Sequence, residues 1–263
     1  YYVSNTAYLL VSAFLGLSLC IVWGYTGIFS FGQVAFYGIA GYTFGIVSIN
    51  LTGPVGTMAG LLVGVAVSGA FAFLVGYFMF YGGVSDVYVA IITLAVTLVL
   101  HTFMGQTAGE EWAVGAARLG GFNGMTEIPS LAIGVGDAAV EITDAVFYYF
   151  VVLALLLTYL GLRVLVNTDF GRVLVAIRED EDRTMMFGYD VKWAKLVVFT
   201  LGGGLAGLSG VLYAARNVYI DPSVFELYFA TLPVVWVSVG GRKSLPGAVV
   251  ATTGIVFISF LGF

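Results

Sequence analysis

Charged side chains are scarce in this sequence. Asp, Glu, Lys and Arg make up 10% of its 263 residues, against about 25% in soluble domains, while hydrophobic residues make up 60%. This excludes an ordinary water-soluble domain, so we expect membrane lipid as the main solvent. One histidine and one cysteine leave no acid–base pair and no set of metal ligands. We therefore expect no catalysis, no metal and no directly bound cofactor, and without a basic patch we expect no nucleic-acid partner.

Long apolar runs fill most of the chain. They occur at about 6–24, 31–50, 56–81, 87–105, 145–166 and 193–215, and less regular runs follow at about 227–239 and 245–263. A membrane helix needs about 20 residues, so the pattern predicts an all-α polytopic membrane protein with about 7–8 transmembrane or re-entrant helices. The run at 227–239 is short and contains Pro233, which favours a kinked or re-entrant segment. Residues 1–263 are expected to form one transmembrane domain, trimmed at both ends.

Basic residues are unevenly distributed along the chain. Six of the ten Lys and Arg residues lie between 163 and 195, and Arg242 and Lys243 follow two spans later. The positive-inside rule places both stretches in the cytoplasm. Residues 106–144 instead hold six acidic residues and one basic residue, Arg118, so we expect an external loop there. The chain should therefore cross the cell (inner or plasma) membrane several times.

Small residues recur every four positions in several of these runs. Gly60, Gly64 and Ser68 form one such ladder, and Gly203 and Gly207 form another. In lipid, small side chains let two helix backbones approach closely. We interpret the ladders as helix-packing surfaces, with a helix contact that moves during transport as the alternative.

The predicted cytoplasmic loop at about 167–192 combines an apolar stripe with a dense charge cluster. Asp169 can cap a helix start, Glu179 and Arg183 have the i,i+4 spacing of an ion pair, and Gly188 can end a helix in a left-handed conformation. One or two short helices are therefore expected below the membrane. A simple connection needs only a few residues, so this length favours a partner-binding surface over a solvated amphipathic connection.

Four stretches, in this order, resemble the permeases of branched-chain amino-acid and urea ABC transporters. They are GYTGIFSFGQVAFYGIAGY at 24–42, GRVLVAIREDE at 171–181 with FGY at 187–189, GGLAGLSGVLY at 203–213, and GGRKSLPG at 240–247. The resemblance implies a membrane path shared with a second homologous permease, two cytoplasmic ATPase subunits that use ATP, and an extracytoplasmic solute-binding protein. It also implies that the cytoplasmic loop couples ATP hydrolysis to transport. Its candidate coupling residues are Gly171, Arg172, Ala176, Arg178, Glu179, Asp180, Arg183 and Gly188.

Candidates for the solute path lie mainly between residues 30 and 42, where polar groups interrupt an apolar span and Gly27 and Gly32 can open the helix. We predict that the path is lined by Ser30, Gln33, Phe36, Tyr37, Tyr42 and, in the external loop, Asn123. Interhelical hydrogen bonding is the alternative role for the polar side chains. Because the spans carry almost no charge, a neutral solute is favoured over a zwitterion.

The stretches GGFNGMT at 120–126 and WVSVGGR at 236–242 resemble the urea and short-amide branch more closely than the amino-acid branch. We therefore predict a permease subunit of an ABC importer for urea or a short amide, with a branched-chain or other amino acid second. A self-sufficient channel or secondary carrier for a small neutral solute is the alternative, although it would have no use for a large charged cytoplasmic loop. GGRKS at 240–244 lacks the spacing of a phosphate-binding loop, so ATP should bind to the partner subunits.

Overall fold

The computed structural model describes residues 2–133, 140–142 and 144–260. Its helices are α1 (Tyr2–Leu19), α2 (Gln33–Asn50), α3 (Pro54–Tyr81), α4 (Asp86–Gly105), α5 (Asp144–Asn167), α6 (Asp169–Glu179), α7 (Glu181–Met186), α8 (Val191–Asn217), α9 (Leu227–Gly240) and α10 (Leu245–Phe260). In the described residues, α1, α3, α4, α5 and α8 are long and apolar enough to cross a membrane, and α9 and α10 are shorter apolar helices. The predicted all-α polytopic membrane fold is confirmed.

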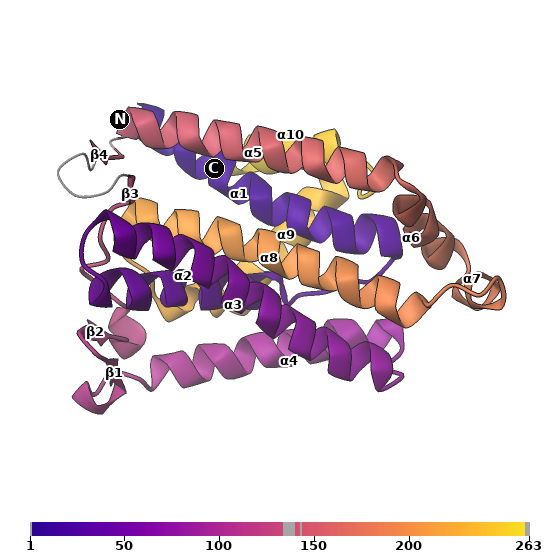
Figure 1. Cartoon of the computed structure of the whole chain (residues 1–263), viewed down its shortest axis with the longest axis horizontal. Coiled ribbons are helices and arrows are strands. Elements are labelled where there is room, and N and C mark those ends of the chain that lie inside the picture. The colour runs from indigo at the N-terminus through magenta and orange to yellow at the C-terminus, as the bar shows by residue number, and fades with distance from the viewer. Residues whose placement is uncertain (1, 134–139, 143, 261–263) are drawn as a thin grey trace.

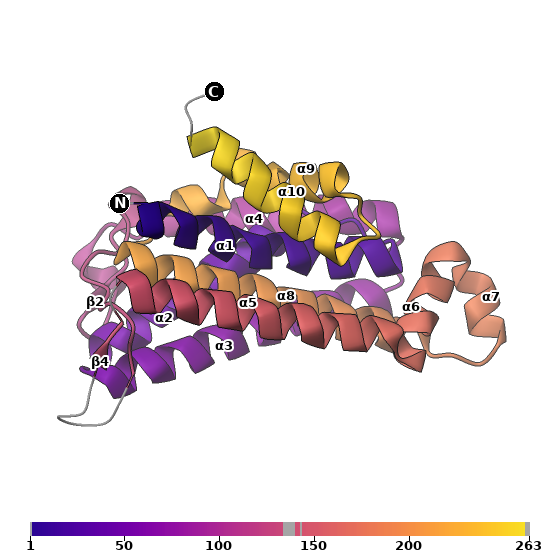
Figure 2. The ribbon, with the colours of Figure 1, turned by 90° about the horizontal axis from the view of Figure 1, so that it is seen from above.

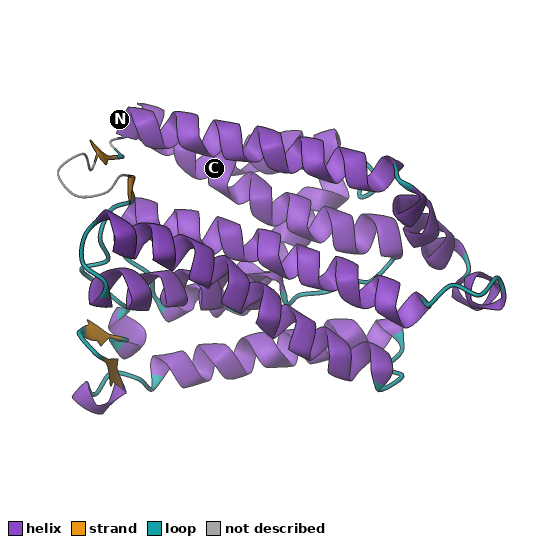
Figure 3. Cartoon of the chain, viewed as in Figure 1, coloured by secondary structure: helices purple, strands orange, loops and turns teal. Residues whose placement is uncertain are grey.

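The long helices run side by side, and the connections gather at the two ends of the bundle (Figure 1, Figure 3). At one end lie two small antiparallel hairpins, β1 (Ala113–Val114) with β2 (Ala117–Arg118) and β3 (Ala132–Ile133) with β4 (Val140–Glu141). At the other end lie α6 and α7. Lys243 Nζ lies 3.7 Å from Glu179 Oε1, so the two basic stretches of the sequence share one end of the molecule.

The small-residue ladders form the centre of the bundle, where α2, α3 and α8 pack together. Ser68 Oγ of α3 lies 2.9 Å from the carbonyl oxygen of Phe36 and 2.8 Å from that of Gly203 on α8. A Cβ added at Gly203 would overlap the methyl group of Ala72, and one at Gly207 would overlap the Ser68 side chain. The backbones approach closely because these positions carry almost no side chain.

The first crossing of the membrane is followed by an interrupted one. The chain leaves α1 through a π-helical turn, Cys20–Gly24, and two further helical residues. Residues 27–32 then run back without helical structure before α2 begins. Gln33, the first residue of α2, has its side-chain oxygen 2.5 Å from Ser18 Oγ. Ser18 lies six residues before Gly24, about 9 Å along the helix, so α2 begins inside the membrane.

A second interruption follows α8, at the opposite side of the membrane. Residues 218–226 lead back into the bundle and include a 3-10 helix, Pro222–Phe225, before α9 starts. The Phe225 ring stacks on Tyr42 of α2, with centroids 6.1 Å apart. The helices are therefore interrupted in this region, but the break precedes Leu227 instead of falling at Pro233, and the re-entrant character stays a prediction. Pro233 lies inside a continuous α9, and this helix tolerates the loss of the one backbone hydrogen bond that proline cannot donate.

Candidate functional site

The predicted cytoplasmic helices exist as α6 and α7, with start signals that differ from the expectation. Thr168, not Asp169, is the N-cap of α6, and its Oγ1 accepts a hydrogen bond from the Gly171 backbone N–H at 3.4 Å. Asp169 is the first helical residue and pairs with Arg172 at 2.9 Å. Leu174 and Ile177 are buried against the bundle, together with Gly171. The apolar stripe thus docks α6 onto the end of the membrane helices.

The predicted ion pair between Glu179 and Arg183 does not form. The chain leaves the helical conformation at Asp180, whose backbone is extended, so the two residues are not one turn apart on a helix. Asp180 instead caps α7, accepting from the Arg183 backbone N–H at 3.0 Å, and also pairs with the Arg183 guanidinium at 2.9 Å. Gly188 has a φ of +88°, which confirms the predicted left-handed stop.

Arg178 joins α6 to the membrane helices. Its side chain is only 13% exposed, and Nη1 donates a 2.7 Å hydrogen bond to the backbone oxygen of Gly24. Nη2 lies 2.5 Å from Glu179 Oε1. The hydrogen bond and charge of Arg178, followed by the charge of Lys243, hold the pKa of the Glu179 carboxyl group below its usual value. Glu179 is therefore anionic at neutral pH and lies between two cations.

The same cluster includes the turn between α9 and α10. Cys20 Sγ lies 3.4 Å from the Arg242 carbonyl oxygen, and a Cβ added at Gly24 would overlap that oxygen. The Arg242 guanidinium lies 5.6 Å from the centroid of the Trp23 ring, within cation–π range. One short helix, α6, therefore contacts the start of the segment that leads to α2 and, through Glu179 and Lys243, the turn that follows α9. The sequence indicated Arg178 but not its partners on α1 and in this turn.

The tip formed by α7 and the turn after it carries exposed apolar side chains. Met186 is 86% exposed and Phe187 is 81% exposed, with Met185 and Tyr189 beside them. This tip projects beyond the end of the bundle (Figure 2). Apolar side chains gathered on an exposed surface are typical of a site that contacts another protein or lipid. Ala176, also a candidate coupling residue, is exposed on α6.

A buried lysine, not singled out in the sequence, ties α7 to two other helices. Lys195 of α8 has a side chain only 6% exposed, and its Nζ lies 3.0 Å from Asp86 of α4 and 2.5 Å from Glu181 of α7. A buried ammonium group needs such partners to offset the loss of water. The position of Lys195 near the start of an apolar run is the only signal the sequence offers.

The candidate path residues on α2 are packed inside the chain. Gln33, Phe36, Tyr37 and Tyr42 are buried. Phe36 packs edge-on against Phe199 of α8, with ring centroids 5.4 Å apart. The interaction of Gln33 with Ser18 fits the alternative role, interhelical hydrogen bonding.

The other two candidates lie apart from these. Ser30 is buried in the non-helical segment, where its Oγ accepts from the Gly32 backbone N–H at 3.0 Å. Thr93 of α4 accepts from the backbone N–H of Phe31 at 3.2 Å, so hydroxyl groups satisfy this interrupted backbone. Asn123 is exposed in the loop between α4 and α5, and its backbone carbonyl oxygen accepts from Tyr219 Oη at 2.9 Å.

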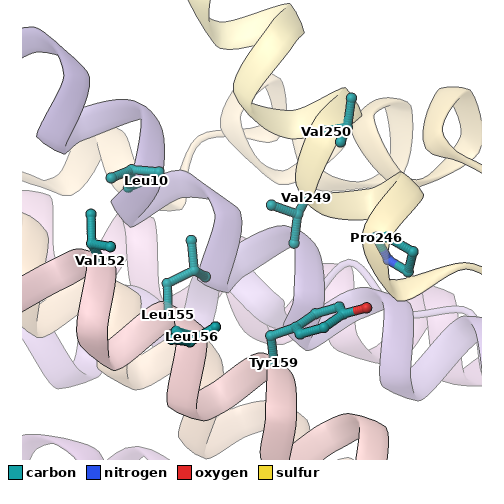
Figure 4. A pocket seen from close by; sticks show the side chains of 8 residues that line it. All are labelled: Leu10, Val152, Leu155, Leu156, Tyr159, Pro246, Val249 and Val250. Atoms are coloured by element: carbon teal, nitrogen blue, oxygen red, sulfur yellow. The ribbon is translucent and has the colours of Figure 1, made fainter.

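A crevice of about 340 Å³ lies between α1, α5 and α10 (Figure 4). Its lining is apolar apart from one phenol group: Leu10, Val152, Leu155, Leu156, Tyr159, Pro246, Val249 and Val250. Such a crevice suits a lipid chain rather than a polar solute. A second, polar cavity of about 310 Å³ lies beside Asp86, Glu181 and Lys195. The candidate path residues line neither of these two cavities.

Comparison with known proteins gives matches to permease subunits of transport systems. The family model described as "Branched-chain amino acid transport system / permease component" matches residues 2–263. The high-affinity branched-chain amino acid transport system permease protein LivM of Salmonella typhimurium is 28% identical over 263 residues, covering 92% of this chain and 59% of that protein. LivM of Escherichia coli is 27% identical over 263 residues with the same coverage. The xylose transport system permease protein XylH of Haemophilus influenzae is 33% identical over 100 residues, 38% of this chain and 26% of that protein.

The chain thus spans about three-fifths of the length of the LivM relatives. No solved structure gives a significant match.

Proposed function

Because this chain belongs to the family of branched-chain amino acid transport system permease components, we propose that it is a membrane subunit of an ATP-driven importer for an amino acid. The two LivM relatives are named for branched-chain amino acid transport, which supports that solute class. The proposed partners are a second homologous permease, two cytoplasmic ATPase subunits and an extracytoplasmic solute-binding protein.

The α6–α7 unit is the observation that carries this proposal. It is fixed to the bundle by Arg178 and Lys195, while Met186 and Phe187 project from it at the end rich in basic residues. A free-standing channel has no use for such an anchored apolar tip in water. A subunit driven by an ATPase needs such an anchored unit, because the motion of the ATPase is transmitted to the membrane helices only through a rigid element.

For the solute, the sequence favours urea or a short amide over an amino acid. One ground was the lack of charge in the spans. The structure weakens that ground, because Glu226 lies at the start of α9, inside the bundle's length. The other ground, the resemblance of residues 120–126 and 236–242 to the amide branch, keeps urea or a short amide as the second candidate.

Docking of an ATPase subunit on the tip formed by α7 is tested with Phe187→Asp, in the chain co-expressed with the ATPases, second permease and binding protein of its transporter. A charged side chain in an apolar contact should weaken it, so co-purification of the ATPase should fall at least about 10-fold. Val114→Asp is the control, because Val114 is an exposed apolar residue at the opposite end. Equal ATPase recovery from both variants, or leucine uptake by the chain alone in ATP-free liposomes, would contradict the proposal.

A further inference from the structure

Glu226 is an exposed carboxylate at the start of α9. It immediately precedes α9, which ends at Gly240 in the turn that carries Arg242 and Lys243. The 14 residue steps from Glu226 to Gly240 correspond to a rise of about 21 Å along a helix, and the hydrocarbon core of a bilayer is about 30 Å thick. Measured from the end of the bundle that holds α6 and α7, Glu226 is therefore well inside the hydrocarbon region.

The contacts of the neighbouring residue give the same depth from the opposite end. Phe225 stacks on Tyr42 of α2, with an angle of 12° between the rings. A Cβ added at Gly38, one turn deeper on α2, would overlap the Phe225 ring. Tyr42 lies eight residues before Asn50, the outer end of α2, which corresponds to about 12 Å. Both estimates place Glu226 between the two membrane surfaces.

The carboxylate of Glu226 lacks a partner within the described part of the chain, where it makes neither an ion pair nor a side-chain hydrogen bond. A charged group at this depth is strongly unfavourable against acyl chains, so it faces a water-filled space or another protein. The lateral surface formed by α5 differs from the surface around Glu226. The exposed side chains of the middle of α5 are apolar, among them Leu153, Leu156 and Leu157.

The surface around Glu226 is amphipathic rather than apolar. Ser223 and Tyr228 are exposed on either side of it, and Ser238 is exposed farther along α9. In Figure 2, α9 and α10 lie on the side of the bundle away from α3 and α5. The Glu226 carboxylate can accept hydrogen bonds from an ammonium group, and the neighbouring hydroxyl groups can donate to a carboxylate. Together they provide the pairing that a zwitterion requires.

We propose that Glu226 lines the solute path and that its carboxylate contacts the ammonium group of the transported amino acid. Ser223 and Tyr228 supply hydroxyl groups near the same point. This inference rests on the proposed function, because it takes an amino acid as the solute. It places the path on the α9 surface of the chain, beside the second permease, rather than among the buried side chains of α2.

Access of water to this position is tested by Glu226→Cys in a Cys20→Ala background, in vesicles that contain the assembled transporter. The matched control is Leu153→Cys, because Leu153 also lies 14 residues before the end of its helix, at Asn167. A charged methanethiosulfonate should react at least about 10-fold faster with the Glu226→Cys protein, and saturating leucine should slow that reaction. Equal rates at both positions, or no slowing by leucine, would overturn the proposal.

The charge is tested by comparing Glu226→Gln with Glu226→Asp. In Glu226→Gln, the leucine concentration for half-maximal ATP-dependent uptake should rise at least about 10-fold, and Glu226→Asp should restore most of the affinity. If the unaltered transporter imports leucine and Glu226→Gln does so with the same half-maximal concentration, the role of Glu226 is wrong while the proposed function stands. If the unaltered transporter imports no amino acid, the proposed function itself fails.

Discussion

The guanidinium group of Arg178 donates a hydrogen bond to the backbone oxygen of Gly24 at 2.7 Å, across 154 residues of sequence. This contact joins α6 to the π-helical turn that follows α1, just before the non-helical segment 27–32 begins. A displacement of α6 would therefore act on that segment and, through Glu179 and Lys243, on the turn before α10. The segment that leads to α2 and the turn that follows α9 thus share one anchor, α6.

Replacing Arg178 by Met should uncouple transport from ATP hydrolysis. The buried carbonyl oxygen of Gly24 loses its donor, and α6 loses its only charged contact with α1 among the described residues. We expect ATP-dependent uptake to fall at least about 10-fold while ATP hydrolysis by the complex continues. Arg163→Met is the control, since Arg163 is exposed on α5 and is not a candidate coupling residue. Similar losses in both variants would assign the effect to the loss of a positive charge at this end of the bundle and not to the Arg178 contact.

Gly24→Ala should destabilise the chain because the added methyl group would overlap the Arg242 carbonyl oxygen, and a backbone atom cannot move aside cheaply. Overpacking of this kind costs about 1–3 kcal/mol. The midpoint of thermal unfolding in detergent should drop, whereas Gly204→Ala should leave it nearly unchanged, because nothing lies within 4 Å of a Cβ at Gly204. An unchanged midpoint for Gly24→Ala would show that the α9–α10 turn yields easily.

The long helices were predictable because each is specified by its own residues. The apolar runs at 56–81 and 87–105 reappear as Pro54–Tyr81 and Asp86–Gly105. A continuous stretch of about 20 apolar residues has no other stable structure in lipid, so no distant contact is needed to identify it.

The interruptions were harder to predict because their backbone partners lie far away in the sequence. The backbone N–H of Phe31 donates to the hydroxyl group of Thr93, and no feature of the sequence near Phe31 indicates that pairing. Glu226 was missed for a related reason. It borders the apolar run that starts at residue 227, and only the position of Phe225 against α2 shows how deep it lies.

Of the candidate site, the coupling residues were easier to predict than the path. Arg178 stands in a charged amphipathic segment, which is a local pattern. Tyr37 and Gln33 also stand out locally as polar groups in an apolar run, but a polar group in a span serves helix packing as readily as solute contact. The pattern does not separate these roles, and the structure places both side chains in buried contacts. Their predicted solute contact stays a prediction.

Lys195→Met should detach α7 from the bundle. The substitution leaves Asp86 and Glu181 facing each other without the cation between them. Both carboxylates are partly exposed and can regain water, so we expect a loss of about 1–3 kcal/mol, below the range for fully buried pairs. Thermal unfolding should shift downward and limited proteolysis near residue 187 should accelerate. Lys192→Met, at an exposed position on the same helix, is the control. Equal proteolysis of both variants would show that the ion pairs do not hold α7.

The orientation in the membrane is open to a direct test, because the two ends of the bundle differ in charge. The end with α6 and α7 carries most of the Lys and Arg residues, whereas the hairpin end carries acidic residues such as Glu110 and Glu111, and the positive-inside rule then puts α7 in the cytoplasm. In a Cys20→Ala background without ATPase subunits, Glu111→Cys should react with an impermeant maleimide on intact cells. Met186→Cys should react only after permeabilisation, and the opposite result would invert the topology and place the α6–α7 unit on the side where no ATP is available.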